Sequence, residues 1–586
     1  MTMITPSPGN PPEPRASTQG PHDHAPPATA APDAAAFGSG PGEPGTLTAV
    51  PQAEQSKTTQ KDAPVTYPGP PRPEQVRATP LAVLADQAGV RAAARAEVTG
   101  ITHDSRAVRP GDVYAALPGA RFHGADFAAQ ASDLGAAAIL TDPAGTERAE
   151  ATGLPVLTVD DPRARMGELA ATVYGHPGRD LLQIGITGTS GKTTTAYLVQ
   201  GGLAATGALP GLIGTVETRI GEERLKSERT TPEATDLQAL FAVMRERGVA
   251  SVAMEVSSHA LVLGRVDGCV FDVAVFTNLS PEHMEFHHGM EDYFQAKAQL
   301  FTKQRSRAGV VNIDDEYGRR LVDESEVPVT TYSAEGHPDA DWRAEDVVVG
   351  PLHSTFTAVG PDGERVRATS PLAGPFNVAN TLAAVAALAV AGLDPQTAAE
   401  GVAAVPGVPG RLERVDEGQD FLAVVDYAHK TDAVESVLRA LRKVTEGRLH
   451  IVLGCGGDRD RTKRGPMGAA AVRLSDTAVL TSDNPRSEDP LAILATMLAG
   501  AAEVPAHERG DVAVFEDRAA AIRAAVARAR AGDTVIVAGK GHEQGQDIAG
   551  VIRPFDDRDV LREALRSAAA DPTAPAVHTT AQQTRG

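Results

Sequence analysis

The sequence has very little cysteine and few aromatic residues. Only Cys269 and Cys455 occur among 586 residues, and Trp342 is the single tryptophan. Two cysteines are too few for a disulfide framework or a four-cysteine zinc site. We therefore expect two buried or incidental thiols in a reducing compartment.

The sequence also lacks an excess of basic residues and any long apolar run. Its formal net charge of -21 and pI near 5.2 argue against a general nucleic-acid-binding protein, because affinity for the phosphate backbone needs a basic surface. No apolar stretch approaches the roughly 20 residues of a membrane-spanning helix, and the N-terminus has no apolar signal core. We expect a cytoplasmic monomer without membrane insertion.

Length and composition predict three α/β domains between two tails. A chain of 586 residues is too long for one core. Residues 1–76 and 571–586 lack hydrophobic periodicity, and we predict that both are disordered. Between them we predict a small α/β domain at 77–179, a central domain at 180–408 and a domain with a mostly parallel sheet at 409–570.

A phosphate-binding loop is the clearest motif. Residues 181–195 read LLQIGITGTSGKTTT, which predicts a buried strand, a glycine turn and a helix beginning near Lys192. Glycines let backbone N–H groups approach phosphate oxygens, Lys192 can reach the outer phosphates, and Thr193 can bind Mg²⁺. The match to the Walker pattern is imperfect, because Ile186 stands where that pattern has glycine. The loop still predicts a nucleoside triphosphate site.

Polar residues follow later strands of the central domain. Glu255 ends the strand in ASVAMEVSSHA, where a carboxylate linked to Mg²⁺ is expected. His283 lies just beyond the strand in FDVAVFTNLS and is a predicted site residue, whereas His287 and His288 are not. Lys297 lies in MEDYFQAKAQLF, a predicted helix, and its position alone indicates a solvated charge.

The outer domains also place polar loops after strands. In the first domain, Ser105 and Arg106 follow a strand; solvation of the loop is favoured over ligand contact there. In the third domain, predicted helices at 431–445, 489–500 and 517–531 alternate with strands that lead into DYAHK, GCGGDRDRTKRG, SDNPRSE and AGKGHEQGQ. Ligands bind beyond the carboxyl ends of parallel strands, so these four loops predict a binding edge.

Ten motifs, in order and spacing, resemble the Mur ligase family over residues 81–567. They are TGTSGKTT, TTPE, MEVSSHAL, NLSPEHMEFH, YFQAKAQLF, PGRLERV, DYAHKTDA, GCGGDRDRTKRGPMG, SDNPRSEDP and AGKGHE. The resemblance implies a first domain that binds a UDP-linked substrate, a central P-loop ATPase domain and a Rossmann-like third domain that binds an amino acid.

The resemblance further implies an ATP-dependent ligase with small-molecule substrates and Mg²⁺. The expected reaction adds diaminopimelate to UDP-N-acetylmuramoyl-L-alanyl-D-glutamate through an acyl phosphate, in peptidoglycan precursor synthesis. The alternatives within the family are a ligase that adds lysine, a ligase that adds the D-alanyl dipeptide, and a ligase that adds glutamate to folate. A nucleotide-binding protein without a ligase step is the alternative from another class.

The resemblance also implies the roles of individual residues. ATP would be bound by Gly188, Thr189, Ser190, Gly191, Lys192, Thr193, Thr194, Asn312 and Arg411. The UDP-linked substrate would be bound by Ser105, near the uridine end, and by Thr230, Thr231, Ser257 and Arg265. The amino acid would be bound by Arg459, Asp483, Asn484, Pro485, Arg486, Gly539 and Glu543.

The resemblance changes the expected role of Lys297, because the lysine at the corresponding position of the family's helix is carbamoylated. The implied metal ligands are Thr193, Glu255, His283 and Lys297 as the carbamate formed with CO₂, and the implied catalytic residues are Lys192, Glu255, His283 and Lys297. In the third domain, Arg486 can pair with a carboxylate through two parallel hydrogen bonds. Diaminopimelate has one carboxylate more than lysine, so Arg486 is expected to set specificity, with Glu543 suited to the distal ammonium.

Overall fold

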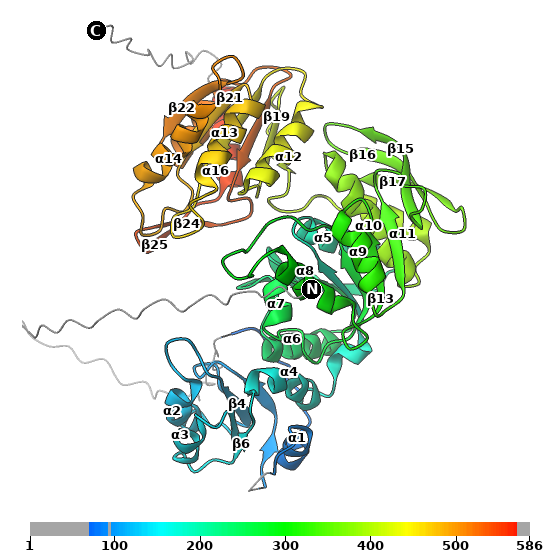
Figure 1. Cartoon of the computed structure of the whole chain (residues 1–586), viewed down its shortest axis with the longest axis vertical. Helices are drawn as coiled ribbons and strands as arrows, with labels where there is room; N and C mark the ends of the chain where they lie inside the picture. Colours follow the sequence, from blue (N-terminus) through cyan, green and yellow to red (C-terminus); the bar gives the residue numbers. More distant parts are fainter. Residues whose placement is uncertain (1–68, 92–94, 571–586) are drawn as a thin grey trace, which may run out of the picture. The chain divides into compact units, whose positions relative to one another are not determined.

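The computed structural model describes residues 69–91 and 95–570. Residues 1–68 of the tail predicted at 1–76, and the whole of the tail predicted at 571–586, lie outside these residues. Three α/β domains, each built on its own sheet, confirm the predicted fold class (Figure 1). Residues 69–76, which the sequence analysis assigns to the N-terminal tail, lie within the described part and make defined contacts, such as that of Arg72 with Asp112.

The first domain has a four-stranded parallel sheet in the order β3-β4-β5-β6. Its strands are Gly100–Thr102, Asp112–Ala116, Ala138–Thr141 and Val156–Thr158. The short pair β1 (Thr79–Pro80) and β2 (Glu97–Val98) precedes it, and the helices are α1 (Leu81–Gln87), η1 (Gly124–Phe127), α2 (Ala128–Asp133), α3 (Thr146–Glu150) and α4 (Pro162–Val173). One apolar cluster joins this domain to Ala234, Ala239 and Ala242 of α6 in the central domain.

The central domain has an eleven-stranded sheet with a parallel middle. The order is β10-β9-β8-β11-β7-β12-β13-β14-β15-β16-β17, and β8 to β15 in that order are parallel, with an antiparallel strand pair added at each end. The bounds are β7 Leu182–Thr187, β8 Leu209–Ile213, β9 Glu217–Ile220, β10 Glu223–Lys226, β11 Val249–Glu255, β12 Phe271–Phe276, β13 Ser306–Asn312, β14 Val329–Ser333, β15 Trp342–Val349, β16 Ser354–Val359 and β17 Arg365–Ser370.

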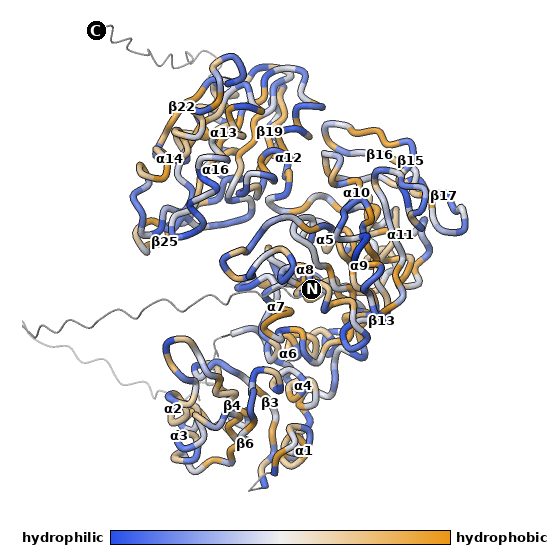
Figure 2. Tube along the Cα trace, in the orientation of Figure 1, coloured by the Kyte–Doolittle hydropathy of each residue, from blue (hydrophilic) through white to orange (hydrophobic). Residues whose placement is uncertain are grey.

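Helices cover both faces of this sheet. One face packs against α5 (Lys192–Ala204), α10 (Pro375–Val390) and α11 (Pro395–Ala403). The other face packs against α6 (Ala234–Glu246), α8 (Met290–Ala298) with η3 (Gln299–Phe301), and α9 (Glu316–Glu324); η2 (Pro177–Asp180) and α7 (Ser258–Val262) are short. The predicted apolar helix after residue 374 is α10, and Figure 2 shows its contrast with the mainly hydrophilic α9.

The third domain has a six-stranded sheet in the order β18-β19-β23-β20-β21-β22, parallel except for β18. The strands are Glu413–Arg414, Leu422–Asp426, Leu449–Leu453, Thr477–Thr481, Asp511–Phe515 and, for β23, Thr534–Ala538. The hairpin β24 (Gly545–Ile548) and β25 (Val551–Pro554) follows. The helices α12 (Thr431–Arg442), α14 (Pro490–Glu503) and α15 (Arg518–Val526) confirm the three predicted ones, with shifted ends.

Two helices of this domain were not predicted, α13 (Arg464–Leu474) and α16 (Asp557–Ala570). α13 begins inside the stretch GCGGDRDRTKRG, which the sequence analysis treats as one loop. At the start of α16, Asp557 forms a fully buried bidentate ion pair with Arg518, with N–O distances of 2.7 Å. Arg518 also donates to Ser482 O and Ala538 O, so this pair holds the ends of β21 and β23 together.

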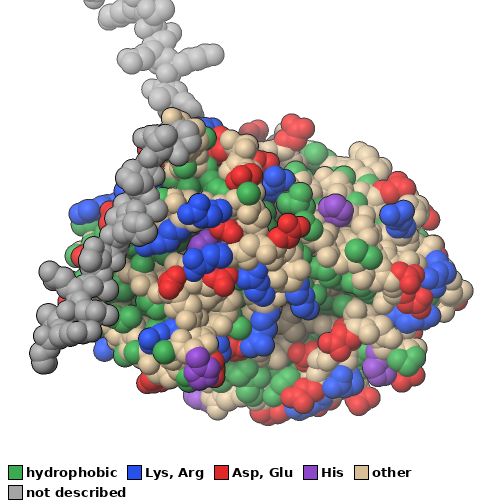
Figure 3. Space-filling model, turned by 90° about the horizontal axis from the view of Figure 1, so that it is seen from above, with side chains coloured by type: hydrophobic (Ala, Val, Ile, Leu, Met, Phe, Trp, Pro, Cys, Tyr) green, Lys and Arg blue, Asp and Glu red, His purple; other side chains and the backbone are tan. Residues whose placement is uncertain are grey.

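Charge is mixed across the surface. The face shown in Figure 3 carries Lys and Arg side chains interspersed with Asp and Glu. Within residues 69–91 and 95–570, no helix is long and apolar enough to cross a membrane.

Candidate functional site

The loop between β7 and α5 is built to approach an anion closely. Gly188 and Gly191 have φ values of 142° and 90°, a region that side chains other than glycine rarely adopt. A Cβ on Gly188 would also collide with the Thr277 hydroxyl. The first turn of α5 has no side-chain cap, so its N–H groups remain available to a phosphate.

Two lysines converge on one carbonyl oxygen of this loop. Lys192 Nζ donates to Gly188 O and Thr189 O, each at 2.9 Å, and Lys297 Nζ donates to Gly188 O at 2.9 Å. Burial lowers the pKa of Lys192. Burial, followed by the charge of Lys192, lowers the pKa of Lys297 well below its usual range. The structure therefore favours a neutral amine at Lys297.

The solvated position that residue type alone indicates for Lys297 is wrong. The side chain is only 1% exposed and lies on the buried face of α8 with Tyr293, whose ring centroid is 4.6 Å from Lys297 Nζ. Tyr293 and Lys297 are four residues apart and so share one face of the helix. The preceding tyrosine was the available sign that this lysine points inward.

Glu255 lies beside the phosphate loop as predicted from its place at the end of β11. Its Oε2 accepts a hydrogen bond from Thr193 Oγ1 at 3.0 Å, and its two oxygens accept two more from Thr215. Carboxylate and hydroxyl oxygens are suitable donors for Mg²⁺. The structure therefore brings one hydroxyl oxygen and one carboxylate oxygen together beside the loop, a pair that could bind a cation.

His283 lies in the loop after β12 with a left-handed backbone, φ 57°. Its ring packs edge-on against His259, with centroids 4.6 Å apart, and lies 6.4 Å from the Tyr293 ring. Burial lowers the pKa of His283, which favours the neutral imidazole that can bind a metal. In the described ranges no three His, Cys, Asp or Glu side chains gather as a metal site. Mg²⁺ needs no such cluster, because it commonly keeps waters and takes phosphate oxygens as ligands.

Three candidate residues for the UDP-linked substrate surround the end of β11. Thr231 is fully buried; its hydroxyl donates to Glu255 O at 2.9 Å and accepts from Ser257 N at 3.2 Å. Thr230 Oγ1 lies 3.0 Å from Thr215 Oγ1. Hydrogen bonds thus connect Thr230 to Glu255 through Thr215, and connect Ser257 to Glu255 through Thr231.

Arg265 is held by a carboxylate that sequence reasoning missed, Glu233. Arg265 Nε donates to Glu233 Oε1 at 2.9 Å, and Arg163 of the first domain donates to Oε2 at 3.0 Å. Burial would raise the pKa of Glu233, but Arg265 and its other cationic neighbours hold it below its usual range. Glu233 is the last residue of the TTPE motif, which was the signal available for it.

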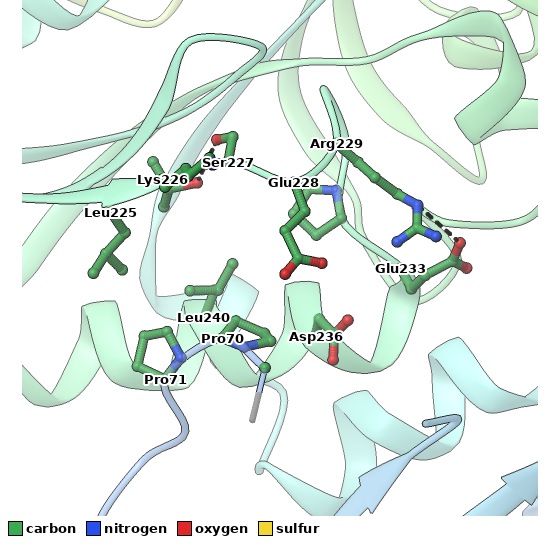
Figure 4. A pocket seen from close by; sticks show the side chains of 13 residues that line it. Pro70, Pro71, Leu225, Lys226, Ser227, Glu228, Arg229, Glu233, Asp236 and Leu240 are labelled. Carbon is green, nitrogen blue, oxygen red and sulfur yellow. Dashed lines mark hydrogen bonds and ion pairs between the residues drawn. The ribbon is translucent and has the colours of Figure 1, made fainter. Parts of the chain in front are cut away.

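A cavity of about 210 Å³ lies next to Glu233, against α6 (Figure 4). Its walls include Leu225 and Lys226 of β10, Arg229, Asp236 and Leu240, together with Pro70 and Pro71 of the segment before the first domain. Arg229 points toward Glu233 at 3.9 Å. Ser105 lies apart from these residues after β3; it is half-buried, and its hydroxyl donates to Gln130 Oε1 at 3.2 Å.

The two remaining nucleotide candidates lie at the end of β13 and just before β18. Asn312 ends β13, and its Nδ2 donates to Thr277 O at 2.8 Å. Arg411 donates to Thr193 Oγ1 at 3.2 Å, and its guanidinium lies 4.5 Å from the centroid of the Tyr427 ring. Arg411 is thereby brought to the phosphate loop, as its assignment as a nucleotide ligand requires.

Three residues of the third domain form a closed polar network. Lys540 Nζ, which is fully buried, donates to Asn484 Oδ1 at 2.9 Å and to Glu543 Oε2 at 3.0 Å. Asn484 Nδ2 donates to the same Glu543 oxygen at 2.8 Å. Lys540 was missed from the sequence, although it lies in the AGKGHE motif. The network turns Glu543 Oε2 inward and leaves Oε1 for a ligand.

Arg486 adopts a left-handed backbone, φ 52°, and its main chain pairs with the hairpin strand β24. Its Nη1 donates to Gly457 O at 2.6 Å. Hydrogen bonds from Ser487 lower the pKa of the Asp458 carboxyl, and Arg486 lies near enough to help lower it, although it contributes less. Asp483 and Pro485 precede Arg486 on the same loop. Gly539 lies close to Asp483, because a Cβ added to Gly539 would be 2.7 Å from Asp483 Oδ2. Arg459 is exposed on the loop after β20.

Glu282 and Lys430 are further charged residues that sequence reasoning missed. They form an ion pair between the central and third domains. Burial would raise the pKa of Glu282, but Lys430 and Lys192 outweigh it and hold the value at about 2. Both residues lie within motifs named above: Glu282 directly precedes His283, and Lys430 is the last residue of DYAHK.

Comparison with protein families gives three matches. The Mur ligase middle domain matches residues 186–388, the Mur ligase glutamate ligase domain matches 410–541, and the Mur ligase family catalytic domain matches 97–174. The three matches fall in the central, third and first domains described above.

Curated relatives are similar over nearly their whole length. The UDP-N-acetylmuramoyl-L-alanyl-D-glutamate–2,6-diaminopimelate ligases of Streptomyces coelicolor and Streptomyces avermitilis are each 82% identical over 503 residues, 86% of this chain and 99% of the relative. The corresponding ligase of Corynebacterium glutamicum is 49% identical over 477 residues, 80% of this chain and 92% of its own.

Solved structures are similar in fold. That of a UDP-N-acetylmuramoyl-L-alanyl-D-glutamate–2,6-diaminopimelate ligase is 34% identical, with a TM-score of 0.59 over 81% of this chain and 96% of its own. That of the UDP-N-acetylmuramoylalanyl-D-glutamyl-2,6-diaminopimelate–D-alanyl-D-alanyl ligase from Acinetobacter baumannii has a TM-score of 0.56 at 18% identity, over 85% of this chain and 99% of its own. At that identity the similarity shows the fold alone.

We predict that the ε-amino group of Lys297 loses its proton at a much lower pH than exposed lysines do, because burial and Lys192 oppose its charge. The unfolded chain would keep a lysine pKa of about 10.4 and would bind more protons between the two values. Stability should therefore rise with pH across that window. Carbon-13 NMR of labelled lysine in CO₂-free buffer, assigned with Lys297→Met, measures this. Titration of Lys297 together with the exposed lysines would contradict it.

Proposed function

Because the chain belongs to the Mur ligase family, we propose that it is an ATP-dependent ligase that joins diaminopimelate to UDP-N-acetylmuramoyl-L-alanyl-D-glutamate. The product is a peptidoglycan precursor. The observation that supports the choice of amino acid is the arrangement of Arg486 in the third domain. It lies on the same loop as Asn484, which donates a hydrogen bond to Glu543.

The reaction requires activation, because joining a carboxylate to an amine in water is uphill. The γ-carboxylate of the D-glutamyl residue attacks the γ-phosphoryl group of ATP, which gives an acyl phosphate and ADP. The amine of diaminopimelate then attacks the acyl carbon, phosphate leaves, and the nitrogen loses a proton. Positioning and charge neutralisation supply most of the catalysis in such transfers.

We assign Lys192 to the outer phosphates, with Gly188, Thr189, Ser190, Gly191 and Thr194 supplying the rest of the loop. Its two hydrogen bonds to carbonyls of the loop support this assignment, because they hold the amino group of Lys192 beside the loop. Asn312 and Arg411 would contact the nucleotide, and Arg411 already contacts Thr193. Thr230, Thr231, Ser257 and Arg265 would hold the muramoyl dipeptide, and Ser105 would lie near the uridine.

Thr193, Glu255, His283 and Lys297 would hold Mg²⁺, and the hydroxyl oxygen of Thr193 and the carboxylate oxygens of Glu255 are the kind of ligand that this ion prefers. Bound Mg²⁺ would neutralise the repulsion between the attacking carboxylate and the phosphate oxygens. Lys297 fits this set only as a carbamate, in which its neutral amine has added CO₂ and released one proton. The lowered pKa supports that addition, because only the unprotonated amine reacts.

In the third domain, Arg486 would pair with the carboxylate that diaminopimelate has and lysine lacks. Glu543 Oε1 would accept the distal ammonium, while Lys540 and Asn484 hold Oε2. Bound lysine would leave the guanidinium of Arg486 without a carboxylate partner. This would weaken the binding of lysine more than the loss of one methylene group would. Asp483, Pro485 and Gly539 would shape the loop, and Arg459 would close the pocket. We further propose that the protein acts as a cytoplasmic monomer.

We predict that phosphate release requires Mg-ATP, the UDP-muramoyl dipeptide and diaminopimelate together. A colorimetric phosphate assay with meso-diaminopimelate, LL-diaminopimelate and L-lysine in parallel measures this, with mass spectrometry of the tripeptide product as confirmation. Turnover only with a diaminopimelate isomer is the expected result. Turnover with lysine alone would contradict the role of Arg486, and phosphate release without either acceptor would indicate an ATPase without a ligase step.

We predict that Arg486→Lys raises the KM for diaminopimelate roughly tenfold or more, because one charged hydrogen bond of ~1.5–3 kcal/mol is lost. The KM for ATP should remain within about twofold. The matched control is Arg439→Lys, since Arg439 lies on the exposed face of α12 and pairs with Glu435. An unchanged KM for diaminopimelate would refute the pocket assignment.

A further inference from the structure

The segment of residues 69–75, which we call the clasp, contacts both domains proposed to bind the UDP-linked substrate. It reads GPPRPEQ and has no helix or strand. Its three prolines fix three φ angles, so the segment is stiff for its length. The sequence analysis assigns it to the N-terminal tail, which makes its contacts unexpected.

Arg72 ties the clasp to the loop that carries Ser105. Arg72 Nη1 donates to Asp112 Oδ2 at 2.6 Å, and Nη2 donates to Ala107 O at 3.2 Å. Both charged side chains are buried, at 9% and 3% exposed. Asp112 also accepts from Arg109 N at 2.8 Å. One guanidinium therefore holds the loop between β3 and β4 at Ala107, two residues after Ser105, and also holds Asp112, where β4 begins.

The other end of the clasp holds the last residue of α6. The main-chain N–H groups of Glu74 and Gln75 donate to the two carboxylate oxygens of Glu246 at 3.0 and 2.9 Å. A carboxylate at the C-terminus of a helix is disfavoured by the helix dipole. The two donors from the clasp offset that cost and link the segment to the central domain.

The start of the clasp forms a wall of the 210 Å³ cavity (Figure 4). Gly69, Pro70 and Pro71 lie on one side, and Arg229, directly before Thr230, lies on the other. Seven residues thus reach the loop of Ser105, the end of α6 and the approach to the TTPE motif. These are the elements that carry the proposed contacts at the uridine and dipeptide ends.

We propose that the clasp sets the spacing between these two ends, and that Arg72 is a positioning residue for the UDP-linked substrate. This inference rests on the proposed function. A long ligand held by two domains binds more tightly when the domains are fixed beforehand, because less freedom is lost on binding. Arg72 does not act on ATP or on the amino acid, so its removal affects one substrate of the three.

The test is Arg72→Met in the full chain, with all three KM values measured by phosphate release. The KM for the UDP-muramoyl dipeptide should rise about tenfold, or ~1.4 kcal/mol, while kcat and the other two KM values stay within about twofold. Glu246→Gln removes one acceptor at the other end and should shift the same KM in the same direction. Arg320→Met is the matched control, since Arg320 forms its bidentate pair with Glu291 on the surface of the central domain.

The outcomes separate the clasp from the proposed function. If wild type shows no turnover with any amino acid, the proposed function fails and the clasp's role fails with it. If wild type turns over but both variants keep the wild-type KM for the UDP-muramoyl dipeptide, the clasp alone is refuted. An equal rise in all three KM values, with a lower melting temperature, would also refute it, because that is the pattern of a merely structural contact. If Arg72→Met does not fold, Glu246→Gln decides by the same criterion.

Discussion

Two lysine side chains share the carbonyl oxygen of Gly188, and much of the site depends on that arrangement. Lys192 and Lys297 both donate to it at 2.9 Å, and burial and their mutual repulsion lower the pKa of Lys297. Two adjacent buried cations are unfavourable unless one loses its proton or negative charge is added nearby. The phosphate binding proposed at the loop and the carbamate proposed at Lys297 would each relieve this condition. The proposed chemistry therefore follows from the electrostatics of the loop.

The sheets explain how distant motifs come together. The phosphate loop follows β7, Glu255 ends β11 and Asn312 ends β13, so three neighbouring regions of the parallel sheet present their residues at the same edge. In the third domain, DYAHK, SDNPRSE and AGKGHE follow β19, β21 and β23 in the same way. Parallel strands place their carboxyl ends together, which is why ligand sites collect there.

Most of the fold could be predicted because its elements have strong local signals. The five parallel strands of the third-domain sheet read as apolar runs, and α10 reads as a strongly apolar helix. α13 could not be read in the same way, because its start is hidden in a glycine- and charge-rich stretch. The prolines of the clasp made it resemble a tail, and the contacts that hold it could not be predicted, because they join it to Ala107, Asp112 and Glu246, which are 35 to 172 positions away.

The candidate site was predictable where residue type and strand end agree, as at Glu255 and Lys192. It was not predictable where tertiary packing changes what a residue can do. Lys297 is buried by the packing of α8, and Glu233 and Lys540 act through partners from other segments. Periodicity places a side chain on a helix face but does not say what covers that face.

The most direct test of this account is whether Lys297 becomes an anion. Wild-type protein equilibrated with carbon-13 bicarbonate should show a carbamate resonance that is absent from Lys297→Ala. That variant should be inactive and should regain part of its activity with short carboxylic acids, which supply the missing oxygen ligands. Full activity of Lys297→Ala without added acid, or an active wild type that shows no labelled carbamate, would contradict the account.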